Sequence, residues 1–73
     1  MRLKDLREDR DIKQSEIAEI LNVRQNTYSQ YENGQRQIPI DLLIILAKFY
    51  NVSVDYILEL TDVDKPYKRG IKG

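Results

Sequence analysis

The sequence predicts a single compact all-α domain, with five helices along residues 1–61. A chain of 73 residues can bury only a small core, which suits a few packed helices better than a more elaborate fold. Apolar residues recur at helical spacing over this stretch, and breaker residues, such as Asn33 followed by Gly34, separate the segments. Residues 62–73 contain a proline, two glycines and four basic residues, and we expect them to form a flexible basic tail.

Composition argues against several classes of function. The chain has neither cysteine nor histidine, which removes disulfides, thiolate chemistry and the commonest metal ligands. We therefore expect no metal, no cofactor and no enzymatic activity, and no small-molecule ligand is evident. There is no apolar run long enough to span a bilayer and no signal peptide, so the sequence predicts a cytoplasmic protein without a membrane partner.

Charge is balanced overall but unevenly distributed. Residues 1–36 hold seven basic and seven acidic residues, residues 37–60 hold one and three, and residues 61–73 hold four and two. If nucleic acid binds, the basic contacts must come from the first half, with the tail as the other source of basic residues. The contribution of phosphate contacts to affinity should then be modest.

The first two helices are expected over residues 2–10 and 14–21. Leu3 and Leu6 recur among charged residues in the first, which is typical of a surface helix with a narrow apolar stripe. The second has apolar residues at helical spacing: Ile17, Ile20 and Leu21. Lys13 precedes it where a capping Ser or Asp would be expected, so this start is poorly capped. Asn22 fits a left-handed helix end.

The third helix, expected over residues 25–32, has two different faces. At about 100° per residue, one arc holds only amide and hydroxyl side chains: Gln25, Asn26, Ser29 and Gln30. Tyr28 and Tyr31 lie on the other side, where they are expected to pack into the core. An uncharged amide face suits the reading of base edges in a DNA major groove, but an ordinary solvated face has the same composition.

The last two helices are expected over residues 40–50 and 54–60. Only Asp41 and Lys48 interrupt the apolar surface of the fourth, so we expect it to form the buried centre of the domain. Ser53 is a good N-cap for the fifth. The fifth carries more apolar side chains than one core contact requires: Val54, Ile57, Leu58 and Leu60. These residues either close the core or form a dimer contact.

Five stretches together carry a recognisable resemblance: LREDR, QSEIAEIL, RQNTYSQYENG, LLIILAKFY and NVSVDYIL. Over residues 3–60 the chain resembles the phage-repressor and Cro-type (XRE-like) helix-turn-helix family. The resemblance implies a five-helix domain of the lambda-repressor-like DNA-binding type, with the helix-turn-helix formed by helices two and three. It also implies a homodimer that binds double-stranded DNA at a near-palindromic operator and represses transcription.

Residue roles follow from the matching positions of the family. Base contacts fall on Gln25, Asn26 and Gln30. Phosphate contacts fall on Gln14, Arg7, Arg24, Asn33, Gly34 and Arg36. Arg7 and Glu32 match positions that form an internal ion pair in relatives. Arg24 departs from the family, which usually has a capping Ser or Thr there, so the helix loses a cap and gains a possible contact to phosphate or guanine.

Two other functions compete with that of a repressor. A protein of the same fold can act as an antitoxin or a protein-interaction module, for which residues 62–73 would have to supply the partner contact. RNA binding is a weaker third reading, because no aromatic residue is predicted on the amide face to stack an unpaired base. For the repressor we expect a bacterial or phage-derived protein that is associated with the nucleoid when bound.

Overall fold

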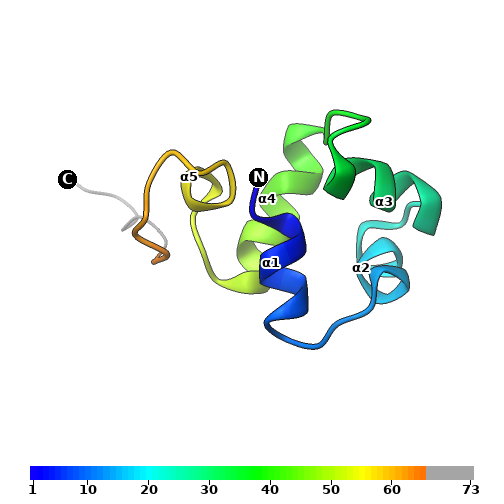
Figure 1. The fold of residues 1–73 in the computed structure, drawn as a ribbon, viewed down its shortest axis with the longest axis horizontal. Coiled ribbons are helices and arrows are strands. Elements are labelled where there is room, and N and C mark those ends of the chain that lie inside the picture. Colours follow the sequence, from blue (N-terminus) through cyan, green and yellow to red (C-terminus); the bar gives the residue numbers. More distant parts are fainter. Residues whose placement is uncertain (66–73) are drawn as a thin grey trace.

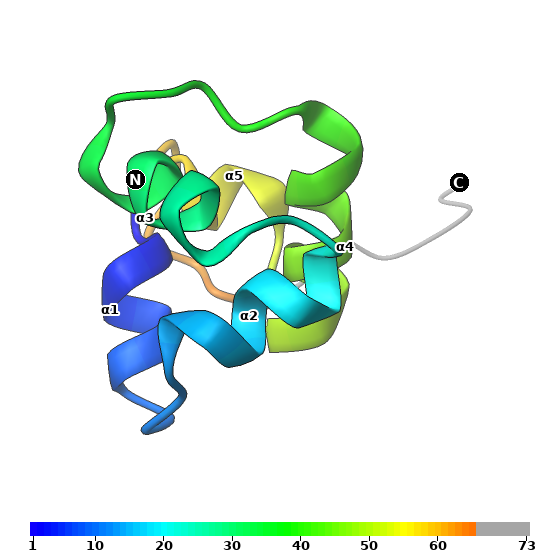
Figure 2. The same cartoon turned by 90° about the vertical axis from the view of Figure 1, so that its right-hand side faces the viewer.

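The computed structural model describes residues 1–65 and contains five α-helices among them (Figure 1). They are α1 (Leu3–Glu8), α2 (Gln14–Leu21), α3 (Gln25–Asn33), α4 (Ile40–Tyr50) and α5 (Val54–Ile57). No described residue lies in a β-strand, which confirms the all-α prediction. Helices α2 and α3 form one end of the domain and α5 the other, while α1 and α4 lie on opposite sides (Figures 1 and 2).

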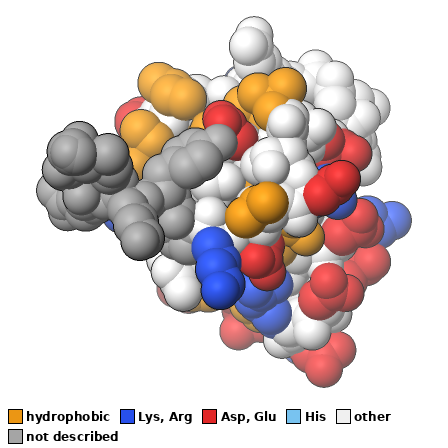
Figure 3. All heavy atoms as spheres, turned by 90° about the vertical axis from the view of Figure 1, so that its left-hand side faces the viewer, with side chains coloured by type: hydrophobic (Ala, Val, Ile, Leu, Met, Phe, Trp, Pro, Cys, Tyr) orange, Lys and Arg blue, Asp and Glu red, His pale blue; other side chains and the backbone are white. Residues whose placement is uncertain are grey.

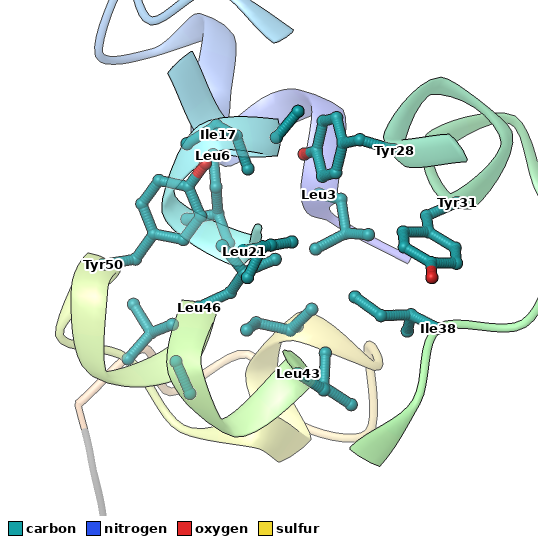
Figure 4. Packing of buried hydrophobic residues seen from close by; sticks show 14 residues of the cluster. Leu3, Leu6, Ile17, Leu21, Tyr28, Tyr31, Ile38, Leu43, Leu46 and Tyr50 are labelled. Atoms are coloured by element: carbon teal, nitrogen blue, oxygen red, sulfur yellow. The ribbon is translucent and has the colours of Figure 1, made fainter. Parts of the chain in front are cut away.

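One apolar core joins all five helices and the loop before α4 (Figure 4). Its large members are Leu3, Leu6, Ile17, Leu21, Tyr28, Tyr31, Ile38, Leu43, Leu46, Tyr50 and Ile57. The rings of Tyr28 and Tyr31 meet edge to face with centroids 6.4 Å apart, a favourable aromatic geometry. Both tyrosines are therefore core anchors of α3, as their helical phase predicted.

Two core tyrosines bury hydroxyl groups that have no hydrogen-bond partner among the described residues, Tyr28 and Tyr50. Burial raises the pKa of Tyr50 to about 12. Burial and the nearby negative charge of Glu32 also raise the pKa of Tyr28. Both phenols are therefore neutral at ordinary pH.

Helix ends follow the local chemistry of the chain. Asn22 and Asn51 take left-handed conformations at the ends of α2 and α4, with φ of 57° at each. Gly34 has φ of 77° at the end of α3, and the backbone N–H of Gln35 donates to the carbonyl of Gln30 at 2.9 Å. The Ser53 hydroxyl accepts a hydrogen bond from the backbone N–H of Tyr56, so the predicted N-cap is confirmed.

Two helices are shorter than the sequence predicts. α1 ends at Glu8 rather than residue 10, because Asp11 takes a left-handed conformation with φ of 54° and the chain turns away. α5 ends at Ile57 rather than residue 60, since Glu59 is also left-handed, with φ of 65°. Neither residue is a glycine or an asparagine, so sequence alone carries little signal for these stops.

The prediction that α4 is buried on all sides is wrong. Its core face is covered, but four large apolar side chains on the opposite face are between 40% and 63% exposed: Ile40, Ile44, Ile45 and Phe49. Only α1, α2, α3 and α5 are available to cover α4 within the described residues, and they reach one side of it. α4 is therefore apolar on both its buried and its exposed surface.

The chain after α5 contacts the domain at least as far as residue 64. Arg2 bonds the carboxylate of Asp62 at 3.0 Å, and the backbone N–H of Ser53 donates to the carbonyl of Asp64 at 3.3 Å. The remainder of the predicted basic tail, residues 66–73, lies outside the described residues. Among residues 1–65, no helix combines the length and apolar character needed to cross a membrane.

Candidate nucleic-acid interface

A tight turn of residues 22–24 links α2 to α3 and sets the angle between them. The left-handed Asn22 reverses the chain, and the backbone N–H of Val23 donates to the carbonyl of Ala18 at 2.9 Å. The Val23 side chain is partly buried and packs against the core. Helix α3 lies at the surface of the domain (Figure 2). Because Tyr28 and Tyr31 are buried, the polar side of α3 is the one that faces solvent.

This polar face forms one side of an open hollow of about 560 Å³. Six side chains line it, and we call it the amide hollow: Gln14, Gln25, Asn26, Ser29, Gln30 and Gln35. Every one of them is an uncharged amide or a hydroxyl, which can both donate and accept hydrogen bonds. The three residues predicted to contact bases therefore lie together, and Gln14 from the start of α2 lies beside them.

The Arg7–Glu32 pair holds α3 against α1. The Nε of Arg7 donates to Glu32 Oε2 at 2.6 Å, and Nη2 donates to Oε1 at 3.1 Å. The two side chains are only 12% and 1% exposed. A third nitrogen, Nη1, donates to the carbonyl of Ile12 at 2.8 Å. Each terminal nitrogen of Arg7 thus has a protein acceptor, and this geometry supports an architectural role more than a phosphate contact.

Gln14 is the third member of this network. Its Nε2 donates to Glu32 Oε1 at 3.0 Å. The Glu32 carboxylate, which belongs to α3, therefore accepts hydrogen bonds from Arg7 of α1 and from Gln14 of α2. Burial by itself would raise the pKa of Glu32, but the hydrogen bonds from Arg7 and Gln14 and the charge of Arg7 outweigh it. The pKa of Glu32 is therefore held below its ordinary value, and the carboxylate stays charged.

The depressed pKa of Glu32 predicts a loss of stability in acid. The charged Glu32 carboxylate stabilises the fold fully at pH values above the pKa of an unfolded glutamate, near 4.5. This stabilisation disappears as the pH falls through the lower pKa that Glu32 has in the folded protein. We expect the free energy of unfolding from urea titrations to fall as the pH drops below about 5, and to fall less steeply for Glu32→Gln. Glu19→Gln, which removes an exposed carboxylate, is the control. Equal slopes in all three proteins would contradict the prediction.

A second hydrogen bond orders the rim of the amide hollow. Arg36 donates through Nε to Gln30 Oε1 at 3.0 Å, across the left-handed turn at Gly34. This bond engages the amide oxygen of Gln30, whose side chain lines the hollow, and does not use its NH₂ group. The side chain of a predicted base reader is therefore oriented by a residue that the sequence marked only for a phosphate.

The other residues predicted to contact phosphate lie exposed around α3. Arg24 precedes the helix and makes no capping hydrogen bond, so the loss of the family's cap is confirmed. Asn33 and Gly34 lie at the opposite end of the same helix. Arg24 and Arg36 are thus exposed cations at the two ends of α3.

The predicted dimer residues do not share one environment. Ile57 is fully buried and belongs to the core of the protomer, and Val54 is partly buried against that core. Leu58 and Leu60 are exposed. Of the four candidates, Leu60 is 71% exposed and Leu58 only 36%, so Leu60 alone presents most of its surface to a partner.

Two residues of the amide hollow carried no site assignment from sequence. Ser29 lies one turn after Gln25, and its helical phase already placed it on the amide face. Gln35 reaches the hollow because the left-handed Gly34 folds the chain back onto Gln30. Only the glycine after the helix could have signalled the position of Gln35, since it marks a reversal of the chain.

A family model described as helix-turn-helix matches residues 3–57, which covers all five helices. The chain belongs to the helix-turn-helix family. The resemblance inferred from the five sequence stretches is therefore confirmed. The matched region contains the amide hollow and the Arg7–Glu32 pair.

The chain is similar to several named regulators and to an antitoxin. The chain is 42% identical over 65 residues to the uncharacterized HTH-type transcriptional regulator YobD of Bacillus subtilis, covering 89% of this chain and 58% of that protein. It is 34% identical over 73 residues to the cryptic phage CTXphi transcriptional repressor RstR of Vibrio cholerae, covering 97% and 66%. It is 38% identical over 51 residues to the antitoxin PezA of Streptococcus pneumoniae, covering 70% and 32%.

The chain spans between a third and two thirds of the length of these relatives. No solved structure gives a significant match.

Proposed function

We propose that this helix-turn-helix protein is a sequence-specific DNA-binding regulator that represses transcription by occupying an operator. The observation that carries the proposal is the amide hollow, in which Gln25, Asn26 and Gln30 lie together on an outward face of α3. A glutamine or asparagine can make two hydrogen bonds to the N6 and N7 atoms of adenine in the major groove. The names of YobD and RstR, a regulator and a repressor, support the same class.

In this proposal, base reading and phosphate binding come from different residues. The amides of the hollow read bases, while the exposed Arg24 and Arg36 and the polar groups near Asn33 and Gly34 meet the backbone on either side. No charged residue lines the hollow itself. Because few cations contribute, we expect the affinity to depend only weakly on salt concentration.

The functional form we propose is a homodimer on a near-palindromic site. Two copies of α3 would enter successive major grooves, with half-site centres about 10 bp apart. Catalysis forms no part of the proposal, since the family and these relatives are described as regulators or an antitoxin.

Selection of bound fragments from random double-stranded DNA tests the proposal directly. We expect enrichment of one motif containing adenine-rich half-sites, repeated in inverted orientation at a centre-to-centre spacing of about 10 bp. A single unrepeated motif would contradict the dimer but leave base reading intact. If no sequence is enriched over the starting pool, the protein is not a sequence-specific regulator.

The rival role as an antitoxin is favoured by the likeness to PezA alone. That likeness covers 32% of PezA, so most of that protein has no counterpart here. A toxin-like reading frame adjacent to the gene would favour this role, whereas a divergent promoter with an inverted repeat would favour the repressor.

A further inference from the structure

The exposed side of α4 is an apolar surface without a partner among the described residues. Six side chains form it, and we call it the α4 outer face: Ile40, Asp41, Ile44, Ile45, Lys48 and Phe49. Four of the six are large and apolar, although a small domain rarely leaves such side chains contiguous and uncovered. α4 lies at the edge of the domain opposite α1, so this face is open to another molecule (Figure 2).

The arrangement of these six residues is symmetric along the helix. The point midway between Ile44 and Ile45 is also midway between Asp41 and Lys48, and midway between Ile40 and Phe49. At about 100° per residue, Asp41 and Lys48 lie within about 20° of each other on the centre line of the face. An acidic residue and a basic residue therefore stand at equal distances from one central point.

We propose that the α4 outer face binds the same face of a second copy of this chain, with the two α4 helices antiparallel. A two-fold axis through the midpoint then places Asp41 of each copy opposite Lys48 of the other copy. Ile44 packs against Ile44 of the second copy, and Ile45 against Ile45, so two apolar contacts lie between two ion pairs. This isologous contact buries the apolar side chains that the fold leaves exposed.

Interactions within one chain do not account for the pattern. Asp41 and Lys48 are about 10.5 Å apart along the helix axis, too far to pair with each other. Neither forms an ion pair with another residue in the described part of the chain. An acidic residue in the first turn and a basic one in the last also favour the helix dipole. That effect is independent of a second copy, and the experiment below separates the two.

The end of the domain that carries α5 offers a weaker surface. Ile57 is buried there, which leaves Leu58 and Leu60 as exposed residues of the predicted contact. Where the described residues form this end, hydrophobic side chains lie in separate spots among polar and charged atoms (Figure 3). The α4 outer face, in contrast, has its four exposed apolar side chains on one helix, together with an acidic and a basic residue that can pair across a two-fold axis.

A dimer joined through the α4 outer face would bring two α3 helices to one operator. For that role, the contact rests on the proposed function. The dimer itself can be measured without DNA. A failure of dimerisation and a failure of DNA binding are therefore distinguishable.

Charge reversal on α4 tests the pairing. In sedimentation of the full chain from micromolar to millimolar concentration, we expect Asp41→Lys and Lys48→Asp each to weaken self-association about tenfold, through like charges at both ends of the contact. The double variant should restore association, because it re-forms both pairs in reverse. If Asp41 and Lys48 act only on the dipole of their own helix, the double variant should not recover. Both substitutions oppose the dipole, so their unfavourable effects on the helix would add. Circular dichroism checks that every variant is folded.

Crosslinking gives an independent measurement, because the chain has no cysteine of its own. Ile44→Cys should form a disulfide-linked dimer on mild oxidation faster than the matched control Ile20→Cys, a residue of α2 with nearly the same exposure. Three results would overturn the proposal: a wild-type protein that is monomeric throughout, a double charge variant that associates no better than the singles, or dissociation by Leu60→Asp but by no α4 variant.

Discussion

Replacing Glu32 with alanine is expected to lower the free energy of unfolding by about 3–5 kcal/mol, because Arg7 is then buried without its counter-charge. The Arg7–Glu32 pair has two short hydrogen bonds and little exposure on either side chain. A domain of this size has only a few kcal/mol of stability, so most of it would be lost. Thermal and urea unfolding at neutral pH measure the change.

The matched control is the exposed ion pair between Arg2 and Asp62. Asp62→Ala should leave the free energy of unfolding almost unchanged, since the Asp62 carboxylate is fully exposed to water. Replacing both Arg7 and Glu32 with apolar residues should cost less than the sum of the single changes, because neither charge is left buried alone. Equal melting temperatures for Glu32→Ala and Asp62→Ala would contradict the prediction, because the buried pair would then contribute no more to stability than the exposed pair.

The same network connects stability to the geometry of the candidate interface. Glu32 lies near the end of α3 and receives hydrogen bonds from α1 and from Gln14 at the start of α2. The other end of α3 begins at Arg24 without a side-chain cap. The position of α3 is therefore fixed by the hydrogen bonds of Glu32 near its C-terminal end and by the packing of its two buried tyrosines. We infer that a change at Glu32 would also disturb the amide hollow.

Sequence reasoning located the elements whose ends are set by local chemistry. The left-handed Asn22 and Gly34 and the capping Ser53 act within a few residues of themselves, and all three behave as predicted. The ends of α1 and α5 were placed two and three residues too late, because Asp11 and Glu59 stop these helices without a residue type that signals a stop. Such stops depend on the packing of the whole domain.

Contacts between distant residues explain what the sequence could not predict. The apolar composition of α4 predicted complete burial, but which sides are covered depends on how many helices are available to surround it. The bond between Gln14 and Glu32 joins residues 18 positions apart, and the bond between Arg36 and Gln30 needs the turn at Gly34. The resemblance supplied the residues of the site, and the structure supplied these bonds between them.

Gln25→Ala and Gln30→Ala are expected to reduce discrimination between the selected operator and random DNA by about 1–3 kcal/mol each, which is the contribution of a well-placed amide to base recognition. Affinity for random DNA should change little, because neither residue carries charge. Binding titrations at fixed salt with both DNAs measure the ratio. Gln37→Ala is the control, since it removes an exposed amide that does not line the amide hollow.

Arg36→Ala should behave differently from these amide variants because of its hydrogen bond to Gln30. Loss of a phosphate contact weakens binding to every sequence and lowers the salt slope by about 1. Release of the Gln30 side chain should in addition reduce discrimination, though less than Gln30→Ala does. If Gln25→Ala and Gln30→Ala weaken operator and random DNA equally, the amide hollow does not read bases. If Arg36→Ala leaves discrimination unchanged, the bond to Gln30 does not position a reader, and Arg36 acts on phosphate alone.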